Sequence, residues 1–349
     1  MNKTLFFVAN ASSIHTVKWV NYFIQEGYNV HLATFSKKNN TACKNIYYLG
    51  NKNPHMGGGN YHYLFSVPKL AQIFKKIQPD TINAHYSYSM GLIALLAKKK
   101  AKIQSEFSVV CYGSDILSPP LPYIFDITNK YILKNSHKVF VVSDQIKEKL
   151  EKFGISMDKV FIGQYGIEKE MLNSEEKDID IISNRAYTSN SQIDLLLDVL
   201  DNIYYKKLKI IFILPGIKES QLLILKRKYP HIIFYDYMEH NTMINLVKRA
   251  KIYISATKSD GTSLSLLEAM AFKCIPVVSN IISNRSWILD GINGYLFSSK
   301  IELEKKLNIA LDREQPNELF KINEQLLLEK GTYLTQMHKI EKFLLGTDI

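Results

Sequence analysis

Residues 259–271 read Ser259-Asp260-Gly261-Thr262-Ser263-Leu264-Ser265-Leu266-Leu267-Glu268-Ala269-Met270-Ala271 and stand between two short runs rich in β-branched side chains. The run before them, Ile252–Thr257, and the run after them, Ile275–Asn280, predict buried strands. The turn and apolar stretch between them predict a connecting helix. A strand, a helix and a second strand in this order form a parallel pair, so the segment indicates an α/β fold.

The same alternation of strand and helix continues through most of the chain. Further strands are predicted at Leu5–Asn10, Val30–Phe35, Thr81–His85, Phe107–Tyr112, Lys138–Ser143, Lys159–Gln164, Ile179–Ser183, Leu208–Leu214 and His231–Tyr237. Helices are predicted at His15–Glu26, Val67–Ile77, Ser89–Lys98, Tyr123–Asn135, Asp144–Phe153, Ser191–Asn202, Ile217–Lys228 and Asn241–Ala250, and from Ile301 to Leu345 the pattern is only helical. Two such series predict two doubly wound, Rossmann-like domains with parallel sheets.

The polar run Asn173–Lys177 predicts the linker between these domains. We therefore place an N-terminal domain at residues 1–172, a second domain at 178–330 and a terminal helix at 331–349 that could pack on the first domain. Ligands bind at the carboxyl ends of strands in such sheets, so we expect the site in a cleft between the domains. The run Met56–Asn60 matches no phosphate-loop pattern, and we interpret it as a mobile loop.

Composition excludes several classes of protein. The chain has 349 residues, and its 46% hydrophobic and 22% charged content excludes a mainly disordered protein. No apolar run approaches the roughly 18 residues that a membrane-spanning helix needs, which argues against an integral membrane protein. The three cysteines, Cys43, Cys111 and Cys274, show no metal-ligand spacing and are interpreted as reduced core thiols of a cytosolic protein.

Charge is distributed unevenly along the chain. Basic residues outnumber acidic ones by 21 to 11 up to Leu172 but only by 23 to 22 after it. This asymmetry predicts a polyanionic partner for the first domain, and we favour an anionic membrane surface. The alternative is that the positive charge only reflects a general preference for lysine in the genome, but such a preference does not explain the asymmetry. Nucleic acid is disfavoured, because no stacking aromatic residues alternate with the lysines and no recognised binding module is present.

The opening stretch has the residue types that a phosphorylated sugar ligand needs. Ser265 and Glu268 fit a capping box, which predicts that a helix begins there and offers free N–H groups to a diphosphate. Asp260 and Glu268 suit sugar hydroxyls as hydrogen-bond acceptors. The alternative is that Glu268 only caps its helix and Asp260 only begins a turn.

This stretch, with Pro276-Val277-Val278-Ser279 and Asp290-Gly291-Ile292-Asn293-Gly294, resembles retaining glycosyltransferases of family 4. Asp260 and Glu268 have the carboxylate-to-Glu spacing of that family, with Asp in place of its usual first Glu. Segments that begin at Ser13, Gly27, Pro79, Tyr112, Val142 and Tyr165 resemble other family elements in the same order.

The resemblance implies a GT-B fold, in which the second domain binds a nucleotide-sugar and the first binds the acceptor. It implies that Asp260 binds donor-sugar hydroxyls and that Glu268 binds the ribose. It also places the diphosphate near the backbone of Gly261, Thr262, Ser263 and Leu264. Tyr237 and Met238 are predicted to lie near the base.

Arg185 stands where the family places an arginine that meets the diphosphate. Its planar fork suits phosphate, and only five arginines occur in the chain, although an ordinary ion pair is the alternative. Many members have a lysine about five residues later, where this chain has Asn190. The only Asp-x-Asp, Asp178-Ile179-Asp180, precedes its strand instead of ending it, which argues against a metal-dependent sugar transferase. The resemblance also implies no metal requirement, and we expect no other cofactor.

Polar residues also lie at the ends of strands of the first domain or just after them, where we predict the acceptor side. They are His15, Thr16, His85, Tyr112 and Asp115. We count His85 with Arg185, Asp260 and Glu268 as candidate catalytic residues, although a lone histidine is more often structural. The remaining histidines, including His240, are interpreted as ordinary.

The sequence therefore predicts a retaining, metal-independent hexosyl- or N-acetylhexosaminyltransferase that uses a nucleotide-sugar, with UDP favoured. The expected acceptor is a lipid-linked glycan in bacterial surface polysaccharide synthesis, and the expected location is cytoplasmic, on the inner face of the cytoplasmic membrane. The alternatives are a nucleotide-sugar epimerase of the same fold and a non-catalytic nucleotide-sugar-binding partner subunit.

Overall fold

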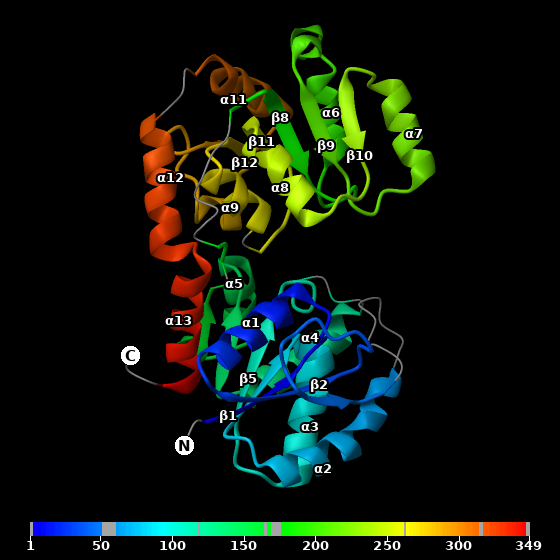
Figure 1. Ribbon diagram of the computed structural model, residues 1–349, viewed down its shortest axis with the longest axis vertical. Helices are drawn as coiled ribbons and strands as arrows, with labels where there is room; N and C mark the ends of the chain where they lie inside the picture. Colours follow the sequence, from blue (N-terminus) through cyan, green and yellow to red (C-terminus); the bar gives the residue numbers. More distant parts are fainter. Residues whose placement is uncertain are drawn as a thin grey trace. The chain divides into compact units, whose positions relative to one another are not determined.

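The computed structural model describes residues 3–50, 61–117, 119, 121–163, 166–168, 176–261, 263–313 and 317–346 (Figure 1). The chain divides into two compact units. Unit 1 consists of Met1–Tyr165 and Gln336–Ile349, and unit 2 consists of Gly166–Thr335. The loop expected at Met56–Asn60 and the first part of the expected linker, residues 173–175, lie outside the described residues.

Unit 1 has a parallel sheet in the order β3-β2-β1-β4-β5-β6-β7. Its strands are β1 (Thr4–Val8), β2 (Asn29–Thr34), β3 (Asn45–Tyr48), β4 (Thr81–His85), β5 (Glu106–Cys111), β6 (Lys138–Val141) and β7 (Val160–Ile162). Its α-helices include α1 (Ile14–Gln25), α2 (Val67–Ile77), α3 (Leu92–Ala101), α4 (Pro122–Lys134) and α5 (Asp144–Lys152). The short helical turns are η1 (Tyr61–Ser66), η2 (Ser87–Gly91) and η3 (Met157–Lys159).

Unit 2 has a second parallel sheet in the order β10-β9-β8-β11-β12-β13. Its strands are β8 (Ile179–Asn184), β9 (Ile210–Ile213), β10 (Ile232–Tyr235), β11 (Ala250–Ser255), β12 (Ile275–Ser279) and β13 (Tyr295–Phe297). Its helices include α6 (Ile193–Leu200), η5 (Ile203–Lys207), α7 (Glu219–Lys228), α8 (His240–Lys248), α9 (Leu264–Ala271), α10 (Ile282–Arg285), α11 (Lys300–Asp312) and α12 (Asn317–Lys330). The final helix, α13 (Tyr333–Leu345), crosses the boundary between the units in sequence.

Both sheets carry the apolar runs that parallel strands need. Leu5, Phe6, Phe7 and Val8 of β1 are all buried, because helices cover both faces of the sheet. Glycines end two of the covering helices. Gly27 and Gly154 have φ of 83° and 69°, the left-handed conformation that commonly follows a helix.

The predicted α/β fold with two parallel sheets is therefore confirmed, and three local features differ from the prediction. The sequence did not predict β3 or β13, because β3 is a half-exposed edge strand and β13 has three residues. The helix predicted to begin at Ser89 is preceded by the π-helical turn η2, and α3 begins at Leu92.

A buried carboxylate fixes the last helix within unit 1. Glu341 of α13 accepts hydrogen bonds from the Tyr22 hydroxyl at 2.5 Å and from the Tyr28 hydroxyl at 2.6 Å. Burial and the neighbouring carboxylate raise the pKa of both tyrosines, so both remain donors at neutral pH. Phe343 packs edge-on against Phe140 of β6, with ring centroids 5.4 Å apart. The helix is thus part of the fold of unit 1.

We expect Glu341→Ala to destabilise unit 1 by about 2–4 kcal/mol, because it leaves two tyrosine hydroxyls without their charged acceptor. Glu341→Gln, which keeps one acceptor oxygen, should cost less. Urea unfolding followed by circular dichroism measures both. The exposed Glu324→Ala on α12 is the control and should stay within about 0.5 kcal/mol of the wild type. Equal stability of Glu341→Ala and this control would contradict the account.

Candidate functional site

The candidate site of unit 2 lies at the carboxyl edge of its sheet. β8 and β11 are neighbours at the point where the strand order reverses. Arg185 directly follows β8, and Asp260 lies in the loop after β11. Open α/β sheets bind ligands at such reversal points, since the loops there diverge and leave a crevice.

Arg185 connects the two loops directly. Its Nη2 lies 2.5 Å from Oδ2 of Asp260, and its Nη1 donates to Oγ of Ser263 at 3.0 Å. The Arg185 side chain is only 18% exposed and that of Asp260 is 25% exposed, so each charge depends on the other for compensation. The structure therefore brings together three of the residues predicted for the donor site.

The helix after this loop begins earlier than predicted. α9 starts at Leu264, and Ser263 is its N-cap, with Oγ accepting from the backbone N–H of Leu266 at 3.4 Å. The capping box predicted from Ser265 is wrong, because Glu268 lies in the second helical turn and Ser263 already caps the first. Gly261 lies in the loop before the cap, whereas Thr262 lies outside the described residues.

Glu268 faces a partner that the sequence analysis missed. Its Oε1 lies 3.0 Å from Nε2 of His240, the first residue of α8. The Glu268 side chain is 7% exposed and that of His240 is 57% exposed. His240, which belongs to another helix, therefore orients the carboxylate of Glu268. This contact does not fit the alternative that Glu268 only caps its own helix. The sequence did contain one indication of this contact. His240 comes just after the predicted strand His231–Tyr237, at the same edge of the sheet as the other predicted site residues.

Asn190, in the position where many family 4 members have lysine, joins the same two loops. Its Oδ1 accepts from the N–H of Ser259 at 3.1 Å, and its Nδ2 donates to the Ser259 carbonyl at 2.8 Å. Its own carbonyl accepts from the N–H of Lys258. An uncharged amide therefore holds the loop that leads to Asp260.

The predicted base-side residues follow β10, the edge strand that β9 separates from β8. Tyr237 is highly exposed, and Met238 packs partly against the core beside α8 and α9. Neither contacts Arg185 or Glu268 in a described hydrogen bond.

The predicted acceptor-side residues gather at the carboxyl edge of the sheet in unit 1. Nδ1 of His85 lies 3.1 Å from the Tyr112 hydroxyl and 3.5 Å from Oγ1 of Thr16. The rings of His15 and Tyr112 are 4.4 Å apart. His15 and Thr16 lie in α1 after β1, His85 ends β4, and Tyr112 directly follows β5. β1 and β4 meet where the strand order of this sheet reverses.

Burial keeps both histidines of this cluster neutral. Desolvation lowers the pKa of His85 to about 3, and the neighbouring His15 adds a smaller lowering. Desolvation lowers the pKa of His15 to about 4. His85 is only 1% exposed, so it acts on its surroundings by holding the Tyr112 hydroxyl.

Asp115 is fully buried and organises the loop around it. It accepts hydrogen bonds from the backbone N–H groups of Ser87, Tyr112 and Gly113 at 2.9–3.1 Å. Burial raises its pKa, and these donors oppose that rise. Beside it, Tyr86 has φ of 73°, a strained conformation for a residue with a side chain, and its ring lies 4.9 Å from that of Tyr112.

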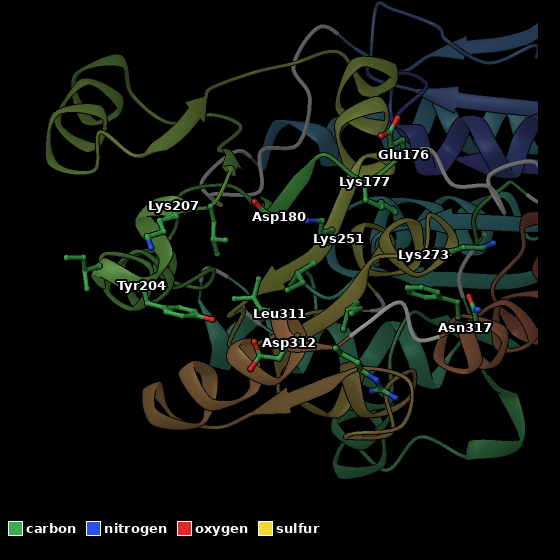
Figure 2. A pocket seen from close by; sticks show the side chains of 17 residues that line it. Glu176, Lys177, Asp180, Tyr204, Lys207, Lys251, Lys273, Leu311, Asp312 and Asn317 are labelled. Carbon is green, nitrogen blue, oxygen red and sulfur yellow. Dashed lines mark hydrogen bonds and ion pairs between the residues drawn. The ribbon is translucent and has the colours of Figure 1, made fainter.

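A separate cavity of 1490 Å³ opens at the opposite, amino edge of the sheet in unit 2 (Figure 2). Asp180, Lys251 and Lys273 line it, together with residues of η5, α11 and α12 such as Tyr204 and Leu311 (Figure 2). None of the predicted site residues lines this cavity.

The Asp-x-Asp sequence lies at the same amino edge of that sheet. Asp178 is paired with Arg249 and Lys209, and Asp180 with Lys251. Its acidic residues are thus engaged in ion pairs at the start of β8, away from Arg185.

Comparison with known families assigns both the N-terminal and the C-terminal half of the chain to glycosyltransferase families. Residues 4–143 match the family described as "Glycosyl transferase 4-like", and residues 166–326 match "Glycosyl transferases group 1". The two matches follow each other along most of the chain. Each half of the chain is therefore a glycosyltransferase domain, and the two together have the GT-B fold.

Solved structures with a similar fold cover nearly the whole GT-B chain. A glycosyltransferase from Rickettsia africae is 16% identical with a TM-score of 0.78, and 99% of this chain aligns with 100% of that one. HepE from Anabaena in complex with UDP-glucose is 11% identical with a TM-score of 0.76, with the same two coverages. The lipopolysaccharide outer core galactosyltransferase WaaB is 16% identical with a TM-score of 0.72, and 99% of each chain aligns. No curated protein sequence matches this glycosyltransferase significantly.

The neutral histidines predict a specific pH dependence of stability. Their pKa values in the fold lie below the ordinary value of about 6.5, so the unfolded chain binds more protons between about pH 4 and 6.5. The stability of unit 1 should therefore fall as pH decreases through this range, by up to about 1.4 kcal/mol per pH unit for each histidine. Urea unfolding at a series of pH values measures the slope.

His15→Gln/His85→Gln should flatten this slope, whereas the exposed His62→Gln should leave it unchanged. Asp115 contributes a slope of the opposite sign in every variant, so the difference between variants isolates the two histidines. A double variant with the wild-type slope would show that the histidines are not held neutral.

Proposed function

We propose that this protein transfers a sugar, with retention of its anomeric configuration, from a UDP-linked donor to a saccharide acceptor. The observation that carries the proposal is the joining of Arg185, Asp260 and Ser263 at the start of α9, with Glu268 one turn further along. A basic side chain, a helix N-terminus and two carboxylates at one edge match the diphosphate, sugar and ribose of a nucleotide-sugar.

Each part of the donor has a proposed partner. The diphosphate lies at the N-terminus of α9 and meets Arg185, whose two described hydrogen bonds leave further N–H donors of the guanidinium for phosphate oxygens. Glu268 accepts from the ribose hydroxyls, and His240 orients it. Asp260 accepts from hydroxyls of the transferred sugar, and Tyr237 and Met238 lie on the base side. The solved HepE structure, similar in fold, contains UDP-glucose, which supports UDP as the nucleotide.

The reaction needs stabilisation of a departing anion. As the bond between the sugar and the diphosphate breaks, negative charge develops on UDP, and Arg185 with the dipole of α9 stabilises it. We propose that this electrostatic assistance replaces a metal ion. Retention follows if the acceptor hydroxyl attacks from the face that UDP leaves and gives its proton to the departing phosphate.

The acceptor is proposed to meet unit 1. Tyr112 and His15 are partly exposed members of the cluster there, and we propose that they contact the acceptor. His85 and Asp115 are buried, and we assign them positioning roles beneath Tyr112 and its loop. The excess of positive charge in the first 172 residues supports a lipid-linked acceptor at the inner face of the cytoplasmic membrane, in bacterial surface polysaccharide synthesis. No helix in the described part of the chain is long and apolar enough to span a membrane.

The test is release of nucleoside diphosphate from a panel of UDP-, GDP- and dTDP-sugars, with EDTA present, with and without a lipid-linked saccharide extract. We expect release from a UDP-sugar that the extract stimulates. Glu268→Ala should lower kcat/KM about 100-fold or more, since it removes a charged acceptor of ribose hydroxyls. The exposed Glu318→Ala on α12 is the matched control and should retain full activity.

Two outcomes of this test would contradict the proposal. Loss of all release in EDTA, restored by a divalent metal, would overturn metal independence. A product in which the free nucleotide-sugar is rearranged without an acceptor would favour an epimerase.

Arg185→Lys should weaken UDP binding about tenfold, because lysine keeps the charge but loses the planar fork that contacts Ser263 and Asp260. Isothermal titration calorimetry with UDP measures the change. Arg227→Lys, on the exposed end of α7, makes the same substitution away from the site and should leave the affinity unchanged. If both variants bind UDP like the wild type, Arg185 does not meet the diphosphate.

A further inference from the structure

Helix α4 of unit 1 turns an apolar face to solvent. Tyr123 is 81% exposed, and Ile124, Ile127 and Tyr131 are also exposed. At 100° per residue these four side chains fall on one side of the helix. Soluble proteins rarely expose such a continuous apolar strip, so this face is suited to a partner.

The opposite face of α4 is anchored in the core. Ile132 and Leu133 are fully buried, and Phe125 packs on Tyr88 of η2 with ring centroids 4.5 Å apart. Asn129 is also buried, and its Nδ2 donates to the carbonyl of Asp115 at 2.8 Å. The helix therefore holds its exposed face rigidly.

Positive charges surround the exposed strip. Lys130 and Lys134 are exposed on the same side of α4. The Nζ of Lys99 from α3 lies 4.8 Å from the centre of the Tyr131 ring. The one acidic residue of the helix, Asp126, is paired with Lys149 at 3.0 Å. The face thus combines apolar and amphipathic side chains with lysines, and no carboxylate among the described residues forms an ion pair with Lys130 or Lys134.

We propose that this face of α4 docks on the surface of a membrane that contains anionic phospholipid. The helix lies in the plane of the interface, with Ile124 and Ile127 among the acyl chains and the tyrosine rings at the level of the headgroups. Lys130 and Lys134 meet the lipid phosphates. We choose a lipid surface as the partner because the lysines beside the apolar strip complement the negative charge of anionic headgroups.

The position of α4 gives this docking a consequence for the neighbouring loop. Asn129 connects the helix to the carbonyl of Asp115, whose side chain holds the N–H of Tyr112. A membrane bound to the exposed face of α4 therefore lies about one helix diameter, roughly 10 Å, from the loop after β5. The inference rests on the membrane location in the proposed function and names the face of unit 1 that meets the membrane. Vesicle binding is measured without donor or acceptor, so its failure is distinguishable from failure of the transferase reaction.

The test is co-sedimentation of the full chain with vesicles of phosphatidylcholine, alone or with phosphatidylglycerol added. We expect binding to the anionic vesicles that weakens with salt. Ile124→Glu/Ile127→Glu should lower partitioning at least tenfold, and Lys130→Gln/Lys134→Gln about tenfold on anionic vesicles only. The matched control is Ile203→Glu/Ile301→Glu, which changes two isoleucines of unit 2 that are about 80% exposed, and it should partition like the wild type.

Circular dichroism and UDP titration of each variant show whether it remains folded, so loss of vesicle binding is separated from loss of structure or of donor binding. Equal partitioning of the α4 variant and the unit 2 control would overturn the proposal. Analytical ultracentrifugation without vesicles provides a second check. A wild-type dimer that Ile124→Glu/Ile127→Glu converts to a monomer would also overturn it, because the occupant would then be a second copy of this chain.

Discussion

The common direction of the strands is the constraint on which both candidate sites depend. Neighbouring strands in both sheets run parallel, so every loop that follows a strand emerges at the same edge. Arg185 and Asp260 are 75 positions apart in the sequence and meet because β8 and β11 are neighbours there. Their partly buried ion pair then fixes the geometry of the loops, since neither charge is stable at that depth without the other.

Unit 1 uses the same constraint for a different kind of site. Its cluster is built from aromatic and neutral histidine rings over a buried carboxylate, Asp115, which is satisfied by backbone N–H groups. The strained Tyr86 lies in this cluster, and such strain persists only where the surrounding packing enforces it. Unit 2 thus presents charges at its edge, suited to a diphosphate, whereas unit 1 presents hydroxyl and ring groups, suited to an uncharged saccharide.

The sequence predicted most of the fold and of the residues at each edge, because strand periodicity and position after a strand are local properties. It could not predict features that depend on distant contacts. His240 reaches Glu268 from another helix, and no local pattern connects two residues 28 positions apart. The burial of His85 and Asp115 depends on packing around η2, which the sequence did not predict. Serine is a favourable N-cap residue, so the sequence alone did not decide between Ser263 and Ser265. In the structure Ser263 caps α9, and it also accepts a hydrogen bond from the distant Arg185.

The central claim is that the edge formed by Arg185, Asp260 and α9 holds the nucleoside diphosphate of the donor. A crystal structure of the protein with UDP tests this most directly. The account predicts the diphosphate at the N-terminus of α9 within hydrogen-bonding distance of Arg185, and the ribose hydroxyls on Glu268. UDP bound instead in the cavity beside Lys251 and Tyr204, at the amino edge of the sheet, would contradict it.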